Sequence, residues 1–144
     1  MTTTFKLHPQ LRADCHLLGS FELSLVLLNR NAALPWFILV PRTDATDLLD
    51  LDVGDRKLAI DESARVSAYV KSELAFPKVN FAAIGNVVPQ LHLHIIGRKP
   101  GDTCWPSPVW GHLEDSVSYE ANRRVSMATD LVQRYGMRGA EELD

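Results

Sequence analysis

Apolar and polar positions along the chain first indicate two pairs of strands. Residues 21–28 and 36–40 are mostly apolar and include β-branched and aromatic side chains, which is typical of buried strands. Residues 78–84 alternate between apolar and polar side chains, and residues 91–96 form the next strand-like run. Gly85-Asn86 supplies turn chemistry within the second pair. Short connections of this kind favour antiparallel neighbours.

The segment between the two strand pairs shows the spacing of helices. Thr43-Asp44 is expected to cap a short helix over residues 43–51, and the turn-forming residues 52–55 are expected to end it. Residues 57–74 predict a long amphipathic helix that must stop before Pro77. The apolar side chains that this helix should bury are Leu58, Val66, Tyr69, Val70 and Leu74.

One more helix is predicted near the end of the chain. Ser116 is expected to cap it and Gly136 to end it, and residues 137–144 are expected to form a frayed tail. The order of strands and helices predicts an α+β fold with a largely antiparallel sheet. The buried stripe of the last helix should consist of Val125, Ala128, Leu131, Val132 and Tyr135.

Composition adds limits on the class of protein. The chain of 144 residues, of which 46% are hydrophobic, fits a single domain over 1–144. A net charge of −3 gives no reason to expect a nucleic-acid partner, whereas a small phosphorylated ligand needs only a few local donors. Cys15 and Cys104 form no disulfide framework. Since no apolar run reaches signal-peptide or membrane-span length, we expect a cytoplasmic protein without a membrane partner.

The strongest candidate for chemistry is the sequence Gln90-Leu91-His92-Leu93-His94. Successive side chains of an extended strand point to opposite faces. Gln90, His92 and His94 would therefore stand in a row on one face, with Leu91 and Leu93 buried on the other. Two imidazoles side by side on a rigid strand, with a carboxamide beside them, predict a reaction surface.

Two simpler interpretations of the same spacing remain open. A half-exposed strand can present polar side chains to water without any further role. Alternatively, His92 and His94 can be a pair of metal ligands, as alternate histidines on a strand often are. The following loop would then have to supply a third ligand, from His112, Cys104 or Asp102.

The residues around the motif resemble the signature of the histidine triad (HIT) superfamily of nucleotide hydrolases and transferases. That signature alternates three histidines with apolar residues and ends on two apolar residues, here Ile95 and Ile96. His92 falls on the central histidine and His94 on the third. Gln90 occupies the place of the first histidine, which is a departure from the usual triad.

The likeness extends from about residue 20 to about residue 110. Residues 27–42 resemble the first hairpin of the family, and Trp105-Pro106 resembles its C-terminal segment. The resemblance implies a HIT-like α+β fold with a mainly antiparallel sheet of about five strands, one long central helix and a C-terminal helix. It also implies that two chains pair as a homodimer.

The resemblance implies that His92 attacks the α-phosphate of a nucleotide derivative and forms a nucleotidyl-histidine intermediate. An imidazole attacks only as the neutral base, and the resemblance makes the backbone carbonyl of Gln90 the acceptor that holds its other nitrogen. His94 would bond a phosphate oxygen or support the leaving group, and as a cation it would stabilise developing charge. The Gln90 side chain cannot titrate, so it would hold a phosphate oxygen or leave the proton-transfer role unfilled.

Three further residues are candidate substrate contacts. The resemblance places Asn29 near the ribose, while Asn86 is expected to touch the phosphate or the leaving group, and Arg98 to attract phosphates. The alternatives are that both asparagines only form turns and that the arginine at the strand end is simply solvated. The Pro-rich segment from Trp105 to Trp110 is expected to fold over the site or over a partner chain, with packing of the two tryptophans in the core as the alternative.

The expected function is that of a nucleotide hydrolase or nucleotidyltransferase acting on a phosphoramidate or a dinucleoside polyphosphate. The partner would be a nucleotide-type small molecule, with no required cofactor, although Mg²⁺ can accompany a polyphosphate. One alternative is a nucleotide-binding module with weak turnover because of Gln90. The other is a metal-binding protein that uses His92 and His94. The base, the leaving group and the physiological substrate stay open.

Overall fold

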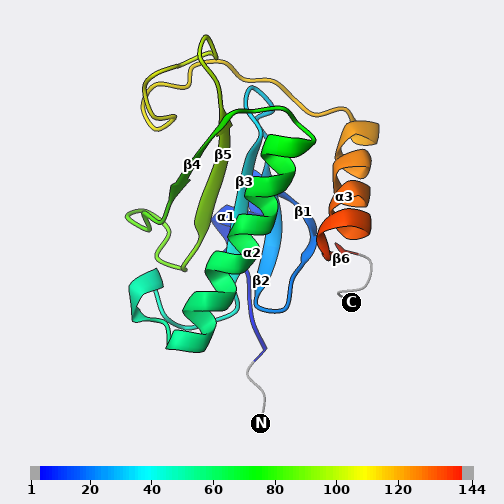
Figure 1. Ribbon diagram of the computed structural model, residues 1–144. Coiled ribbons are helices and arrows are strands. Elements are labelled where there is room, and N and C mark those ends of the chain that lie inside the picture. Colours follow the sequence, from blue (N-terminus) through cyan, green and yellow to red (C-terminus); the bar gives the residue numbers. More distant parts are fainter. Residues whose placement is uncertain (1–3, 141–144) are drawn as a thin grey trace.

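The computed structural model describes residues 4–140, which build one six-stranded antiparallel sheet (Figure 1). The strands are β1 (Cys15–Ser20), β2 (Ser24–Asn29), β3 (Trp36–Pro41), β4 (Lys78–Ala82), β5 (Leu93–Arg98) and β6 (Arg138–Gly139). Their spatial order is β4-β5-β3-β2-β1-β6, so β5 lies inside the sheet between β4 and β3.

Three α-helices and one 3-10 turn accompany the sheet. They are α1 (Pro9–Asp14), η1 (Leu48–Asp50), α2 (Val53–Ser72) and α3 (Ala121–Tyr135). The long helix α2 lies across one face of the sheet, and α3 stands beside the β1 edge (Figure 1). Within residues 4–140, no helix is both long and apolar enough to cross a membrane.

Both predicted strand pairs are present. β2 and β3 pair antiparallel with Leu28 opposite Phe37, and β4 and β5 pair with Phe81 opposite Ile95. The prediction omitted β1, whose residues mix polar and apolar side chains and follow α1 without a connecting turn. With β1 and the two-residue β6, the sheet has six strands rather than about five.

The starts of the predicted helices were wrong. Asp52 does not end a helix but caps α2, because its carboxylate accepts a hydrogen bond from the Asp55 amide at 2.8 Å. The short helix predicted over residues 43–51 is reduced to η1. The last helix begins at Ala121 rather than after Ser116.

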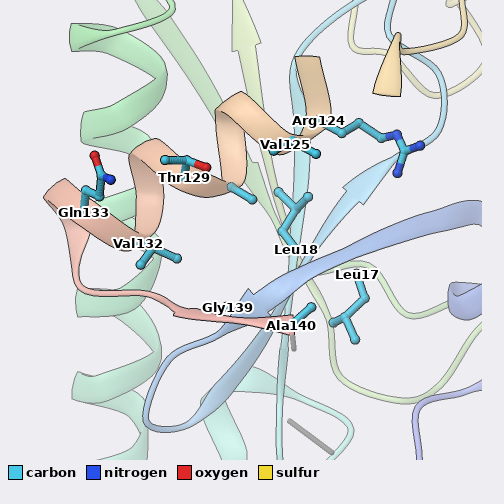
Figure 2. Close-up of a pocket in the computed structure, with 10 residues that line it drawn as sticks. Leu17, Leu18, Arg124, Val125, Thr129, Val132, Gln133, Gly139 and Ala140 are labelled. Atoms are coloured by element: carbon cyan, nitrogen blue, oxygen red, sulfur yellow. The ribbon is translucent and has the colours of Figure 1, made fainter. Parts of the chain in front are cut away.

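The end of α3 was predicted correctly, and its buried face was predicted in part. Gly136 ends α3 with φ of 78°, a left-handed conformation that glycine adopts without strain. Leu131 is buried as expected, whereas Val125 is 64% exposed and Met127 is buried in its place. Val125 instead borders a surface hollow of about 340 Å³ between α3 and β1 (Figure 2).

Part of the predicted frayed tail is ordered. Met137 is buried, and β6 pairs with β1 so that Arg138 lies opposite Ser20. The ordered structure therefore continues past residue 137, while residues 141–144 lie outside the described part of the chain.

Alternation along β2 and β3 divides the apolar side chains between the two faces of the sheet. Leu28 and Phe37 belong to the main core under α2, whereas Leu27 and Ile38 pack on the other face with Leu11 of α1. Ile38 lies opposite His94 in the sheet. The candidate histidines therefore lie on the face that α1 partly covers.

A buried carboxylate joins α2 to the hairpin between β1 and β2. Glu62 is fully buried, and its two carboxylate oxygens accept hydrogen bonds from the amides of Leu23 and Ser24 at 2.9 and 3.0 Å. Without these bonds, α2 would cover two amides of the turn that have no hydrogen-bond partner. Glu62 thereby fixes how α2 sits on the sheet.

Candidate active site

A cleft of about 390 Å³ opens on the α1 face of the sheet and contains both candidate histidines. His92 directly precedes β5, and His94 is the second residue of that strand. Trp36 begins β3, and Trp110 lies in the Pro-rich loop. The other residues that line the cleft are Gln10, Leu11, Asp14, Cys15, Asn29, Ile38, Ile84, Gly85, Asn86, Val87 and Val88.

His92 is oriented by the backbone of its own chain segment. Its Nδ1 lies 2.7 Å from the carbonyl oxygen of Gln90, the contact that the family resemblance implies. In the neutral ring Nδ1–H donates to this carbonyl, so Nε2 carries the lone pair. His92 is 7% exposed, and the lone pair is therefore held in a mostly dry site that a small ligand can enter.

His94 lies beside His92 and is uncharged near neutral pH. The two ring centroids are 4.9 Å apart. Burial, and then the charge of His92, lower the pKa of His94 to about 4. In the free protein the neutral ring is therefore favoured, because a buried imidazolium lacks solvation. The expected action of His94 as a cation during the reaction stays a prediction.

Trp36 sets the tautomer of His94. Its indole Nε1 donates a hydrogen bond to His94 Nδ1 at 3.0 Å, so the proton of the neutral His94 ring sits on Nε2. His94 is thus a fixed hydrogen-bond donor next to the nucleophile. Sequence reasoning missed Trp36, which was assigned only to a strand, because 58 positions separate it from His94.

Trp110 closes the other side of His94. Its ring lies edge-on to His94 at 5.0 Å and to Trp36 at 5.8 Å between centroids. The expectation that the Trp105 to Trp110 segment folds over the site is confirmed for Trp110. Trp105 instead stacks against the guanidinium of Arg98 at 5.7 Å.

Gln90 does not share the reaction surface with the histidines. The regular strand begins at Leu93, so the expected alternation does not extend back to Gln90. Its side chain is absent from the lining of the cleft and bonds the backbone of Lys6 and His8 instead. The prediction that the Gln90 carboxamide holds a phosphate oxygen finds no support in this arrangement.

Asn29 and Asn86 both line the cleft, as expected of substrate contacts. Asn29 ends β2, and its Oδ1 accepts a hydrogen bond from the Asn31 amide at 2.9 Å, which fixes the side chain in a tight turn. Asn86 is exposed and follows Gly85, whose φ of 67° forms the turn before the motif. Their contacts with substrate stay predictions.

Arg98 lies outside the cleft and is committed to a buried ion pair. The side chain is 1% exposed, and its Nε and Nη2 contact the two Asp102 oxygens at 2.8 and 3.1 Å. Nη1 donates to Asn80 Oδ1 at 3.0 Å. The prediction that Arg98 attracts substrate phosphates is therefore replaced by a role in anchoring the loop after β5.

The loop residues proposed as a third metal ligand are engaged elsewhere. Asp102 pairs with Arg98, and Cys104 Sγ lies 3.5 Å from the same guanidinium. His112 is exposed and turns its Nδ1 toward the carbonyls of Pro108 and Trp110. Across residues 4–140, no three His, Cys, Asp or Glu side chains gather in a group that could hold a metal ion.

Replacing Trp36 with phenylalanine should raise the pKa of His94 and reduce turnover about tenfold. The indole donor favours the neutral ring, because an imidazolium would direct a second N–H at it. Titration of His94 by NMR and a pH–rate profile measure both effects. Trp110→Phe is the matched control, since that ring contacts His94 edge-on. An unchanged His94 titration in Trp36→Phe would contradict this role.

The fold and paired histidines are those that the resemblance implies, and comparisons with known proteins agree. The HIT domain family model matches residues 10–101, so the chain belongs to the HIT family. Members of this family generally are hydrolases or transferases that bind nucleotide-type ligands. Comparison with curated proteins found no match.

Three solved histidine triad proteins are similar over nearly the whole chain. One from Bradyrhizobium japonicum is 37% identical, with 92% of this chain and 98% of that chain covered and a TM-score of 0.85. One from Sinorhizobium meliloti 1021 is 32% identical, with coverages of 90% and 96% and a TM-score of 0.84. One from Marinobacter aquaeolei VT8 is 39% identical, with coverages of 90% and 94% and a TM-score of 0.82.

Proposed function

We propose that this protein is a nucleotide hydrolase or nucleotidyltransferase that forms a covalent nucleotidyl-His92 intermediate. The observation that carries the proposal is the 2.7 Å contact between His92 Nδ1 and the Gln90 carbonyl oxygen. It orients the ring and leaves the lone pair of Nε2 for attack on phosphorus. Family membership supports the same reaction class.

The proposed reaction has two steps at phosphorus. In the first, the His92 Nε2 lone pair forms a nitrogen–phosphorus bond while the bond to the leaving group breaks, and the leaving group departs with that electron pair and takes a proton from solvent. In the second, water or another acceptor attacks phosphorus and loses its proton to solvent, while the nitrogen–phosphorus bond breaks and its electron pair returns to Nε2. His94 donates its Nε2–H to a phosphoryl oxygen in both steps, which stabilises developing negative charge.

The side chains of the cleft favour a substrate with one phosphoryl group. None of the residues that line it is lysine or arginine, and Asp14 is acidic. A phosphoramidate or similar monophosphate derivative therefore fits better than a polyphosphate, whose charges would need a cation such as Mg²⁺. An adjoining hollow of about 570 Å³, which shares Asp14, Asn29, Trp36 and Trp110 with the cleft, offers room for the leaving group. Arg30 lines this hollow but not the cleft, so one cation lies near the leaving group rather than beside the histidines.

The test is to incubate the protein with a nucleoside phosphoramidate or, separately, a dinucleoside polyphosphate with and without Mg²⁺. Intact mass is measured after an acid-free quench, because phosphorus–nitrogen bonds to histidine are cleaved by acid. A nucleotide-sized adduct and release of nucleoside monophosphate are expected. Tight nucleotide binding with neither adduct nor product would indicate a binding module. Stoichiometric zinc in the purified protein would instead support a metal role for His92 and His94.

The proposed homodimer would form at the β4 edge of the sheet. Phe81 on β4 and Ile60 on α2 are 45% and 47% exposed and border an apolar hollow of about 180 Å³. Phe81→Glu should therefore shift the protein from dimer to monomer in analytical ultracentrifugation, because a charge would replace buried apolar area. Val125→Glu on α3 controls for added charge at another exposed apolar site. A monomeric unmodified protein would reject the dimer.

The cytoplasm stays the proposed location. The support is the pair of free cysteines, since Cys15 is buried and burial raises the pKa of its thiol to about 12. Cysteines left unpaired are typical of proteins in a reducing compartment.

A further inference from the structure

We infer that Gln90 is a positioning residue that fastens the N-terminal segment, residues 6–8, to the chain just before His92. Through this contact it holds α1 as a wall of the substrate cleft. Only the predicted effect of Gln90 on substrate binding rests on the proposed function. The clamp itself is a structural feature that can be measured without turnover.

The Gln90 carboxamide makes two hydrogen bonds to the backbone of this segment. Its Oε1 accepts from the His8 amide at 2.8 Å, and its Nε2 donates to the Lys6 carbonyl at 2.8 Å. The side chain therefore pairs with an N–H and a C=O two residues apart, as a neighbouring strand would. These contacts join positions more than 80 residues apart in the sequence.

A carboxamide is the side chain that suits this pair of partners. It presents a donor and an acceptor side by side, whereas a carboxylate has no donor for the Lys6 carbonyl. The two nitrogens of an imidazole diverge across the ring and cannot reach both partners at once. A histidine at position 90, as in the usual triad, would therefore lose at least one of the two bonds.

The clamped segment leads directly into the cleft. His8 is the cap of α1, because its Nδ1 accepts from the Gln10 amide at 3.0 Å. The helix then contributes Gln10, Leu11 and Asp14 to the lining of the cleft. Meanwhile the backbone carbonyl of Gln90 contacts His92 Nδ1. One residue thus fixes the nucleophile by its main chain and the substrate wall by its side chain.

The experiment compares Gln90→Ala, which removes both hydrogen bonds, with His8→Pro, which removes the one donated by the His8 amide. His8 has φ of −55°, so proline fits the backbone there while deleting the amide that donates to Gln90. His8→Ala controls for the lost helix cap, since it keeps the amide. Amide hydrogen exchange of residues 10–14 is measured in each variant, together with kcat and KM for the phosphoramidate.

Gln90→Ala and His8→Pro should both speed exchange of residues 10–14 and raise KM about twofold to tenfold, as expected for lost hydrogen bonds, with kcat changed less. Gln90→Ala combined with His8→Pro should be no worse than Gln90→Ala combined with His8→Ala, because both double variants lack the cap and the His8 amide then has no carboxamide oxygen left to contact. Exchange unchanged from wild type would overturn the clamp. A higher kcat and a shifted pH profile in Gln90→His would also overturn it, because they would mean that the side chain at position 90 acts on the reacting group. An inactive wild type would refute the proposed function, and exchange would still decide the clamp.

Discussion

His92→Ala is expected to abolish the nucleotide adduct and to lower kcat/KM by at least about a thousandfold. The substitution removes the nucleophile while leaving the Gln90 carbonyl and the rest of the cleft in place. Steady-state kinetics on a nucleoside phosphoramidate, combined with intact-mass measurement during turnover, test both expectations.

A matched histidine outside the cleft provides the control for this prediction. His16 lies on β1, next to Arg30, and contributes nothing to the cleft lining. His16→Ala should therefore keep the adduct and wild-type turnover. An adduct that persists in His92→Ala would show that another group attacks phosphorus, and the proposed intermediate would then be wrong.

The fold was predicted best where apolar residues follow one another along the chain, because β2, β3 and β5 are buried on both faces. The β2–β3 pair follows from two apolar runs, and the β4–β5 pair from an alternating segment followed by an apolar run. β1 was missed because its pairing partners, β2 and β6, are what make its mixed sequence a strand. Helix starts were misplaced for a similar reason. Asp52 has the composition of a turn residue, and only the structure shows that its carboxylate caps α2.

The pair of histidines was predicted from the sequence, whereas the contacts that two tryptophans make with His94 were missed. Alternation within one short segment places His92 beside His94, and the resemblance assigns the Gln90 carbonyl as the partner of His92. Trp36 reaches the site through sheet pairing, and Trp110 arrives on a loop, so neither contact leaves a local pattern in the sequence. Local spacing also failed for Gln90, since its direction is set by a segment more than 80 residues away.

Loss of the Asp102 carboxylate is expected to lower the free energy of unfolding by about 3–5 kcal/mol. The Arg98 and Asp102 side chains are 1% and 2% exposed, so Asp102→Ala would leave a buried guanidinium without its counter-charge. The Asp102 carboxylate also accepts hydrogen bonds from the Lys99 and Cys104 amides at 3.0 and 3.2 Å. Because this cluster anchors the loop that carries Trp110, the cleft should loosen as well. Urea unfolding measures the effect.

The pH dependence of stability gives this prediction a second measurement. Burial raises the pKa of Asp102, but the hydrogen bonds from Arg98 and the backbone outweigh it and lower the pKa to about 2. The unfolded state therefore binds the proton more readily, so the contribution of Asp102 to stability is present above about pH 4 and lost as pH falls toward 2. Asp102→Ala should lack this part of the acid transition.

Two further comparisons show how much of the loss in stability comes from the unpaired buried charge and how much from the lost side-chain contacts. Replacing both partners, Arg98→Met with Asp102→Leu, should cost less than Asp102→Ala alone, because no unpaired charge stays buried. The exposed pair of Arg65 and Asp61, at 3.1 Å, is the matched surface control, and Asp61→Ala should change the free energy of unfolding by less than about 1 kcal/mol. If Asp102→Ala costs no more than Asp61→Ala, the buried pair does not anchor the loop.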